Sequence, residues 1–202
     1  MAVTLEQIKE LRKRTGAGIH QVKEALDTSK GDMEKAILYL REKGIAKAAK
    51  RAGNSSQYGV VGHYIHGGGS IGVIVELTCE TDFAARSDKF KDIAHDIAMH
   101  IAAADPQYVN IEDIPLEVIE KEKQVYNAEL EGKPESIKEK ILEGKLAKFY
   151  EEIVLSEQAY IKDDSKKIKD IINEAVSAIG EKLEVGRFAR IEIAGTGTQS
   201  GF

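Results

Sequence analysis

The stretch IGVIVELTCETDFAARSD, residues 71–88, decides the fold. Its first half alternates between apolar and polar residues, which predicts a β-strand over 70–79 with one buried face. The residues on the buried face are Ile71, Val73, Val75, Leu77 and Cys79. Cys79 is therefore expected to be a buried thiol that packs as a small apolar group.

The second half of the stretch leads into a helix predicted over Ser87–Ala104, whose apolar stripe has helical spacing. Either Thr81 or Asp82 is suited to cap a helix that starts near Phe83. The ring of Phe83 has two interpretations at this junction. It is either a core residue or an aromatic anchor exposed for a partner protein, and the residues alone leave both open.

Two more strands complete a small antiparallel sheet. Tyr58–His66 and the strand at 70–79 flank three glycines, which is typical of a β-hairpin. Arg187–Ala194 alternates and predicts the third strand. Between these strands, Pro115–Gly132 and Ser136–Tyr150 predict a helical hairpin at about 115–150, with coiled-coil spacing of Ile119, Tyr126 and Leu130 against residues 137–149. A helix is predicted over Lys166–Leu183, and the tail at 195–202 is predicted to be disordered.

Three short helices are predicted upstream of the sheet. Thr4 with Gln7 forms a weak capping box for the first, the second starts at Ile19, and Asp32 caps the third, which is expected to stop at Gly44. Residues 47–57 read as a linker. The prediction is an α+β chain with an N-terminal module at 1–53 and a sheet-and-helix core at 54–202.

The composition is typical of a soluble globular protein: 202 residues, 31% charged and 42% hydrophobic. No apolar run approaches the roughly 18–20 residues of a membrane helix. The first residues resemble neither a signal peptide nor a transit peptide. Cys79 is the only cysteine, so an intrachain disulfide is excluded and a cytoplasmic location is expected.

Catalytic chemistry finds little support. His63 and His66 would point to opposite faces of a strand, and His95 and His100 are five apart on a helix, so no metal site is expected. The three glycines open a strand rather than a helix, which argues against a phosphate cradle. Asp163 and Asp164 are interpreted as a helix cap. We expect no enzyme activity, no catalytic residue and no cofactor.

The charge is uneven. Residues 1–53 carry 12 Lys/Arg against 7 Asp/Glu, whereas residues 54–202 carry 17 against 27. A nucleic-acid adaptor that uses the basic residues from Arg41 to Arg51 is therefore one alternative, although interleaved aromatics and an RNA-binding motif are missing. A solvated helical surface is the simpler explanation. A purely structural partner-binding protein is a further alternative.

Several segments resemble the translation elongation factor Ts family. LRKRTGAGIHQVKEAL (Leu11–Leu26) resembles its N-terminal signature, and ELTCETDFAARSD (Glu76–Asp88) resembles its second signature. GDMEKAILYLREKG, KAAKRAGN, HDIAMHIAAADPQYV and a long segment from Gly132 to Tyr160 also look like family segments, in the same order. The resemblance covers nearly the whole chain and indicates the short form of the family, with a single core unit.

The resemblance implies a guanine-nucleotide exchange factor for elongation factor Tu, with a UBA-like N-terminal bundle that docks on the nucleotide-binding domain of Tu. The docking signature corresponds to Leu11, Arg12, Thr15, Gly16, Gly18 and Lys23. The segment that reaches the magnesium and phosphate region corresponds to Thr81, Asp82, Phe83 and Ala84. The C-terminal part of the core is expected to approach another domain of Tu.

The chain departs from the family pattern at three places. Val22 replaces a frequent cysteine, Thr78 an asparagine, and Ala84 a valine. Since Ala84 offers less apolar surface beside Phe83, somewhat weaker binding is expected. Short members pair through their sheets, so a non-covalent homodimer is expected, giving a complex of two Ts and two Tu, with no direct nucleic-acid or membrane binding. Cys79 is not expected to bridge subunits.

Overall fold

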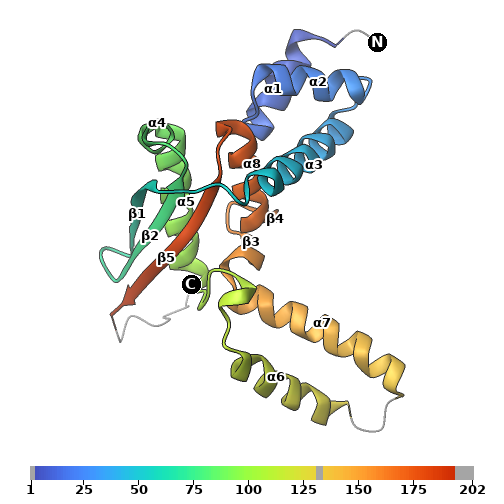
Figure 1. Cartoon of the computed structure of the whole chain (residues 1–202), viewed down its shortest axis with the longest axis vertical. Coiled ribbons are helices and arrows are strands. Elements are labelled where there is room, and N and C mark those ends of the chain that lie inside the picture. The colour runs from blue at the N-terminus through green and yellow to red at the C-terminus, as the bar shows by residue number, and fades with distance from the viewer. Residues whose placement is uncertain (1–2, 131–133, 194–202) are drawn as a thin grey trace, which may run out of the picture. The chain divides into compact units, whose positions relative to one another are not determined.

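The computed structural model describes residues 3–130 and 134–193 and has the predicted α+β architecture (Figure 1). The α-helices are α1 Leu5–Thr15, α2 Ile19–Thr28, α3 Met33–Arg51, α4 Asp82–Arg86, α5 Asp88–Ala104, α6 Leu116–Glu129, α7 Glu135–Ile153 and α8 Ile168–Ile179. Two short 3-10 helices are η1 Ile111–Asp113 and η2 Leu155–Glu157. The strands are β1 Tyr58–His66, β2 Ile71–Cys79, β3 Ala159–Tyr160, β4 Asp163–Lys167 and β5 Leu183–Glu192.

The chain forms two compact units, each built from three segments. The first contains the residues up to His63, Ile74–Ala98 and Lys169–Phe188, and the second contains Tyr64–Val73, Met99–Ile168 and the residues from Ala189 on. The division of the chain into an N-terminal module and a core at residue 53 stays a prediction.

The sheet has the strand order β1-β2-β5 (Figure 1). Its central strand confirms the alternation: Val75, Leu77 and Cys79 are buried, whereas Ile74 is exposed. On α5 the residues of the apolar stripe, Phe90 and Ile97, are also fully buried. The alternating pattern of residues 71–79 therefore predicted the buried face correctly.

The three N-terminal helices pack around one apolar cluster, which includes Leu11, Val22, Leu26 and Leu40. Both predicted caps are present. The Thr4 hydroxyl accepts the backbone N–H of Gln7, which completes a capping box, and the Asp32 carboxylate accepts the N–H of Lys35. These caps fix where α1 and α3 begin, because they satisfy N–H groups that have no partner inside the helix.

The prediction that the third helix stops at Gly44 is wrong. α3 continues to Arg51 and takes up the first part of the predicted linker. Gly44 is buried, and a Cβ atom there would lie 3.2 Å from the backbone oxygen of Asn173 in α8. The glycine allows two helix backbones to approach closely rather than ending a helix.

The helix predicted over Lys166–Leu183 is shorter in the structure. Its expected first residues belong to β4, which pairs antiparallel with β3, and α8 ends before Gly180, whose φ of 93° suits glycine. Asp163 and Asp164 are therefore not helix caps, and Asp163 instead accepts the hydroxyl proton of Ser165. β5 begins at Leu183, four residues earlier than predicted.

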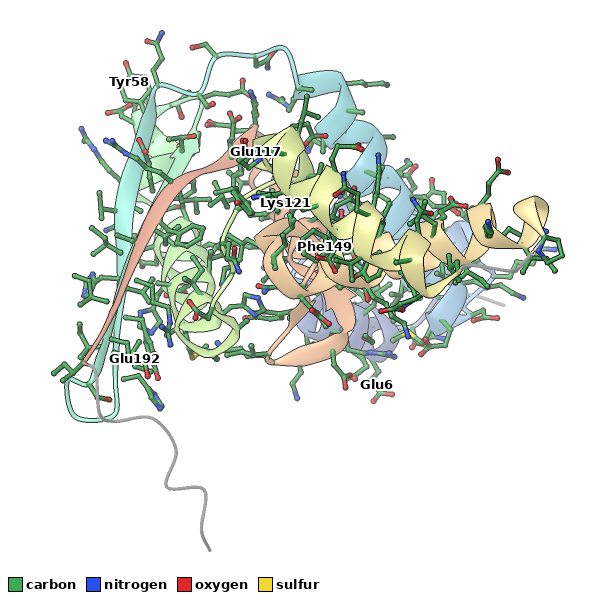
Figure 2. The ribbon with its side chains drawn as sticks, turned by 90° about the horizontal axis from the view of Figure 1, so that it is seen from below. Glu6, Tyr58, Glu117, Lys121, Phe149 and Glu192 are labelled. Atoms are coloured by element: carbon green, nitrogen blue, oxygen red, sulfur yellow. The ribbon has the colours of Figure 1, made fainter. Side chains whose placement is uncertain are left out.

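α6 and α7 form the predicted helical hairpin (Figure 1). Ile119 and Phe149 both pack on a small apolar cluster formed by Ile114, Ile153 and Val154. Figure 2 labels Phe149 on α7 and two residues of α6, Glu117 and Lys121. Ile137, which was predicted to face α6, is 48% exposed. The predicted turn residues Gly132 and Lys133 lie outside the described residues, as do Ala194 and the tail at 195–202.

Candidate partner-binding site

α4 presents one bare aromatic side chain. Of the two predicted cap residues, Thr81 and Asp82, Thr81 is the cap: its hydroxyl accepts the N–H of Ala84 at 3.3 Å. Ala84 and Ala85 are each 6% exposed and point into the protein, so Phe83 must leave the helix on its other side. Phe83 is 81% exposed. The core interpretation of this ring is therefore wrong.

Charged groups flank the ring on the same short helix. The carboxylate of Asp82 lies 2.9 Å from the guanidinium of Arg86, a pair with i,i+4 spacing. Both side chains are solvent-exposed, at 40% and 77%, so the pair adds little stability. Its effect is to place one negative and one positive group beside Phe83.

Two glutamates hold the chain just before α4, in a reciprocal arrangement that we call the glutamate clamp. The Glu181 carboxylate accepts two hydrogen bonds from Thr81. The backbone N–H of Thr81 donates one at 3.0 Å, and the hydroxyl of Thr81 donates the other at 2.7 Å. Glu80 accepts the backbone N–H of Lys182 at 2.5 Å. Each glutamate thus binds the residue that follows the other one in the chain.

Glu80 also ties the clamp to the end of α3. Its carboxylate accepts hydrogen bonds from Arg51 at 2.7 Å and from Asn54 at 3.0 Å. The Lys182 backbone N–H, together with Arg51 and Asn54, lowers the pKa of the Glu80 carboxyl below its usual value, because each donor favours the charged form. Glu80 therefore carries its charge at neutral pH.

Cys79 contacts the same turn through its thiol group. Its thiol donates to the Thr81 carbonyl at 3.2 Å and is fully buried. Burial raises the pKa of the thiol. A buried, protonated thiol is a poor nucleophile, so Cys79 has the packing role predicted from the sequence.

The predicted docking signature separates into turn residues and exposed charges. Leu11 is buried, and the Thr15 hydroxyl donates to its carbonyl at 2.7 Å. Gly16, at φ 64°, ends α1, and Gly18 precedes α2. The charged members Arg12 and Lys23 are both exposed.

One contact joins this signature to the helix that follows α4. The Nζ of Lys89, near the start of α5, donates to the carbonyl of Gly16 at 2.8 Å. Burial lowers the pKa of Lys89. The structure therefore brings the α1–α2 turn and the first turn of α5 into contact, although 73 positions separate the two residues.

Four basic residues between Arg41 and Arg51 already contact acidic or carbonyl groups of this chain. Arg41 pairs with Asp170 at 2.5 Å, Lys43 pairs with Glu24, Lys47 donates to the Ser177 carbonyl at 3.1 Å, and Arg51 pairs with Glu80. Cations that are already neutralised release fewer counterions on binding a polyanion. This arrangement disfavours the nucleic-acid alternative.

Sites for small molecules and metals are poorly supported. A pocket of about 330 Å³ in the second unit is lined partly by Tyr64, His66 and Arg190. Its polar side chains already have partners: Tyr64 bonds His66 at 3.1 Å, and Arg190 pairs with Glu192, outside the pocket, at 2.7 Å. Across 3–130 and 134–193, no three His, Cys, Asp or Glu side chains gather as metal ligands, and no helix is long and apolar enough to cross a membrane.

An exposed aromatic on a short helix whose cap is held by hydrogen bonds is typical of a surface that contacts another protein. Comparison with known proteins gives the family. The model of the family described as elongation factor TS matches residues 4–193. The chain is 51% identical over 197 residues to elongation factor Ts of Thermotoga neapolitana, covering 98% of this chain and all of that protein. It is 54% identical to elongation factor Ts of Geobacter sulfurreducens, covering 94% and 89%. The chain therefore belongs to the elongation factor Ts family.

The sequence did not reveal the glutamate clamp. Glu80 is adjacent to the Thr81–Ala84 segment, but no local pattern in the sequence indicated its partners. Glu181 lies 100 positions away from Thr81, inside a predicted helix. A glycine at position 180 was the one available signal, since glycine commonly ends a helix and turns the chain.

Proposed function

We propose that this chain is a guanine-nucleotide exchange factor that binds elongation factor Tu in its GDP form and promotes release of GDP. The single observation that carries the proposal is the exposure of Phe83 on α4, at 81%. Family membership supports it, since relatives at 51–54% identity are named elongation factor Ts.

The physical basis is a coupling free energy between two ligands of Tu. If the factor and GDP each bind Tu well alone but poorly together, whatever the factor costs GDP, GDP costs the factor equally. The magnesium ion that holds the phosphates of GDP is a large local charge. Displacing the groups around that ion weakens nucleotide binding.

In this proposal Phe83 enters a groove on the nucleotide-binding domain of Tu, near the magnesium and phosphates. Truncating a buried aromatic anchor of this kind costs about 2–4 kcal/mol, so its burial can offset part of the lost nucleotide affinity. Asp82 adds negative charge near the metal and orients the segment, together with Thr81 and Ala84. No residue of this chain takes part in a covalent step.

Docking on Tu is assigned to the α1–α2 region. Arg12 and Lys23 supply exposed positive charge there, while Leu11, Thr15, Gly16 and Gly18 shape the turn that carries them. The C-terminal part of the core is proposed to contact a second domain of Tu.

A non-covalent homodimer is part of the proposal. In the second unit, Ile65 in β1, Ile191 in β5 and Ile193 just after β5 are 62%, 73% and 59% exposed. Exposed apolar side chains of this kind favour a protein contact where they gather. A pair of chains would then carry two Tu molecules. A monomer mass from light scattering at micromolar concentration would rule the dimer out.

The test is release of a fluorescent GDP from elongation factor Tu, with the parent chain and with Phe83→Ala. The parent should accelerate release strongly, and the variant should be much slower at equal concentration. Leu116→Ala is the matched control, because Leu116 is 80% exposed and lies outside both proposed contact segments. Equal acceleration by parent and Phe83→Ala would remove Phe83 from the mechanism, and no acceleration by either would contradict the function.

The nucleic-acid alternative has a separate test. Strongly salt-dependent binding to RNA, together with no effect on GDP release, would favour it. The internal pairing of Arg41, Lys43, Lys47 and Arg51 argues for the opposite result.

A further inference from the structure

We propose that Glu181 is a positioning residue for Phe83: by binding both donors of Thr81, it fixes the cap of α4 and so the direction in which the ring is presented. This inference rests on the proposed exchange function. It adds a residue that lies outside the Thr81–Ala84 segment and reaches it from the turn between α8 and β5.

The first step of the argument is the hydroxyl of Thr81. A hydroxyl has one proton and two lone pairs. The hydroxyl donates a hydrogen bond to Glu181 Oε1 at 2.7 Å, while its oxygen accepts one from the N–H of Ala84 at 3.3 Å. Because the O–H bond points at the carboxylate, the lone pairs stay directed toward the helix. The hydrogen bond to Glu181 therefore restricts rotation of the Thr81 side chain away from its capping position.

The second step is the backbone of Thr81. Its N–H donates to Glu181 Oε2 at 3.0 Å, and its carbonyl oxygen accepts hydrogen bonds from the Cys79 thiol and from the N–H of Ala85. Every polar group of Thr81 is therefore bound. Thr81 lies two residues before Phe83, so this leaves the ring with little freedom beyond its own side-chain rotations.

The third step is how Glu181 itself is held. Gly180 donates its N–H to Val176 and turns the chain at φ 93°, which places Glu181 immediately after α8. The next residue, Lys182, is fixed by Glu80 through its backbone N–H at 2.5 Å. The glutamate clamp thus fixes the chain before α4 and the turn after α8 together. Holding the ring of Phe83 in one direction lowers the conformational entropy lost when the ring binds a partner.

The substitution that tests this is Glu181→Gln. It preserves size and leaves one oxygen in place of two, so only one of the two Thr81 donors keeps an acceptor. Glu184→Gln is the matched control. The side chain of Glu184 contacts Ser56 and the Nζ of Lys182, and neither of these contacts involves Thr81 or the Lys182 backbone N–H that Glu80 binds. Thermal unfolding of each variant establishes that the fold is retained.

A double-mutant cycle on the dissociation constant for nucleotide-free Tu separates positioning from general weakening. With Phe83 present, Glu181→Gln should raise the dissociation constant roughly fivefold, the factor that corresponds to the loss of one hydrogen bond. In the Phe83→Ala background it should have almost no effect. An equal factor in both backgrounds, or no effect in either, would overturn the proposal.

A second readout does not depend on Tu. The chain has no tryptophan, so Phe83→Trp creates a single emitter at the site. Adding Glu181→Gln should enlarge the nanosecond component of its anisotropy decay, while Glu184→Gln should leave it unchanged. An unchanged decay with Glu181→Gln would refute the positioning role. If the parent chain neither binds Tu nor releases GDP, the proposed function fails, and the anisotropy still decides whether Glu181 orders position 83.

Discussion

The guanidinium of Arg41 lies 2.5 Å from the carboxylate of Asp170, although 129 positions separate the two residues. The pair joins α3 to the start of α8, next to the close approach of Gly44 and Asn173. The Asp170 side chain is 7% exposed and that of Arg41 is 39% exposed. The hydrogen bond to Asp170 raises the pKa of Arg41.

Arg41→Ala should destabilise the protein, because it removes an ion pair and a hydrogen bond to a buried carboxylate. We expect about 2–3 kcal/mol, below the loss for fully buried pairs, since water reaches the arginine. Urea unfolding measures the change. Lys43→Ala is the control, because both side chains of its pair with Glu24 are exposed. A loss of stability above about 1 kcal/mol in Lys43→Ala would show that burial of the carboxylate does not decide the effect.

Glycines at two helical positions should respond in opposite ways. Gly144 in α7 has no heavy atom within 4 Å of an added Cβ, so Gly144→Ala should stabilise by up to about 1 kcal/mol through helix propensity. Gly44→Val should destabilise by about 1–3 kcal/mol, because its side chain would meet the backbone of α8. Thermal unfolding compares them, and a stable Gly44→Val would argue against the α3–α8 packing.

His100 should make stability depend on pH. It is fully buried, its Nε2 bonds Gln158 at 3.0 Å, and its Nδ1 has no partner within the described residues. Burial lowers the pKa of His100 below its usual value of about 6.5. The unfolded chain therefore binds a proton at this residue more readily than the folded chain does. The contribution of His100 to the free energy of unfolding is fully present above about pH 6.5, and it is lost as the pH falls toward the lower pKa of the folded state.

Urea midpoints between pH 5 and 8 test this for the parent and for His100→Gln. The parent should lose stability toward pH 5, and the variant should lose less over the same range. A parallel decline in both would assign the pH dependence to other groups. Carboxylates such as Glu80, whose pKa is lowered, contribute mainly at more acidic pH.

Cys79 should be unreactive in the folded protein. It is fully buried and burial raises the pKa of its thiol, so a thiol reagent should modify it only when the chain opens. Labelling should be slow in buffer and fast in denaturant. Rapid labelling under native conditions would show that β2 opens easily.

The elements with strong local patterns could be predicted from the sequence. Alternation in residues 71–79, the caps at Thr4 and Asp32, and the stripe of α5 each depend on residues a few positions apart. The family signatures then pointed to Phe83 as a partner residue, although the residues alone could not decide between core and surface. Its exposure depends on Ala84 and Ala85 taking the inner side of α4.

The errors have one physical origin, which is contact between distant segments. Gly44 looked like a helix end because its neighbour Asn173 in α8 is remote in the sequence. Asp163 and Asp164 looked like a cap because the pairing of β4 with β3 is not a local pattern. Glu181 remained unnoticed for the same reason, since its importance lies entirely in its contact with Thr81.

The bare ring of Phe83 also bears on how the free protein behaves in a crowded solution. A large uncovered aromatic invites sticking to other chains. Here the oppositely charged Asp82 and Arg86 stand on the same short helix, and an isolated apolar group among charges is too small a patch to drive non-specific association. Phe83 can therefore stay exposed on α4 without this helix promoting non-specific association, because the charges beside the ring keep the apolar surface small.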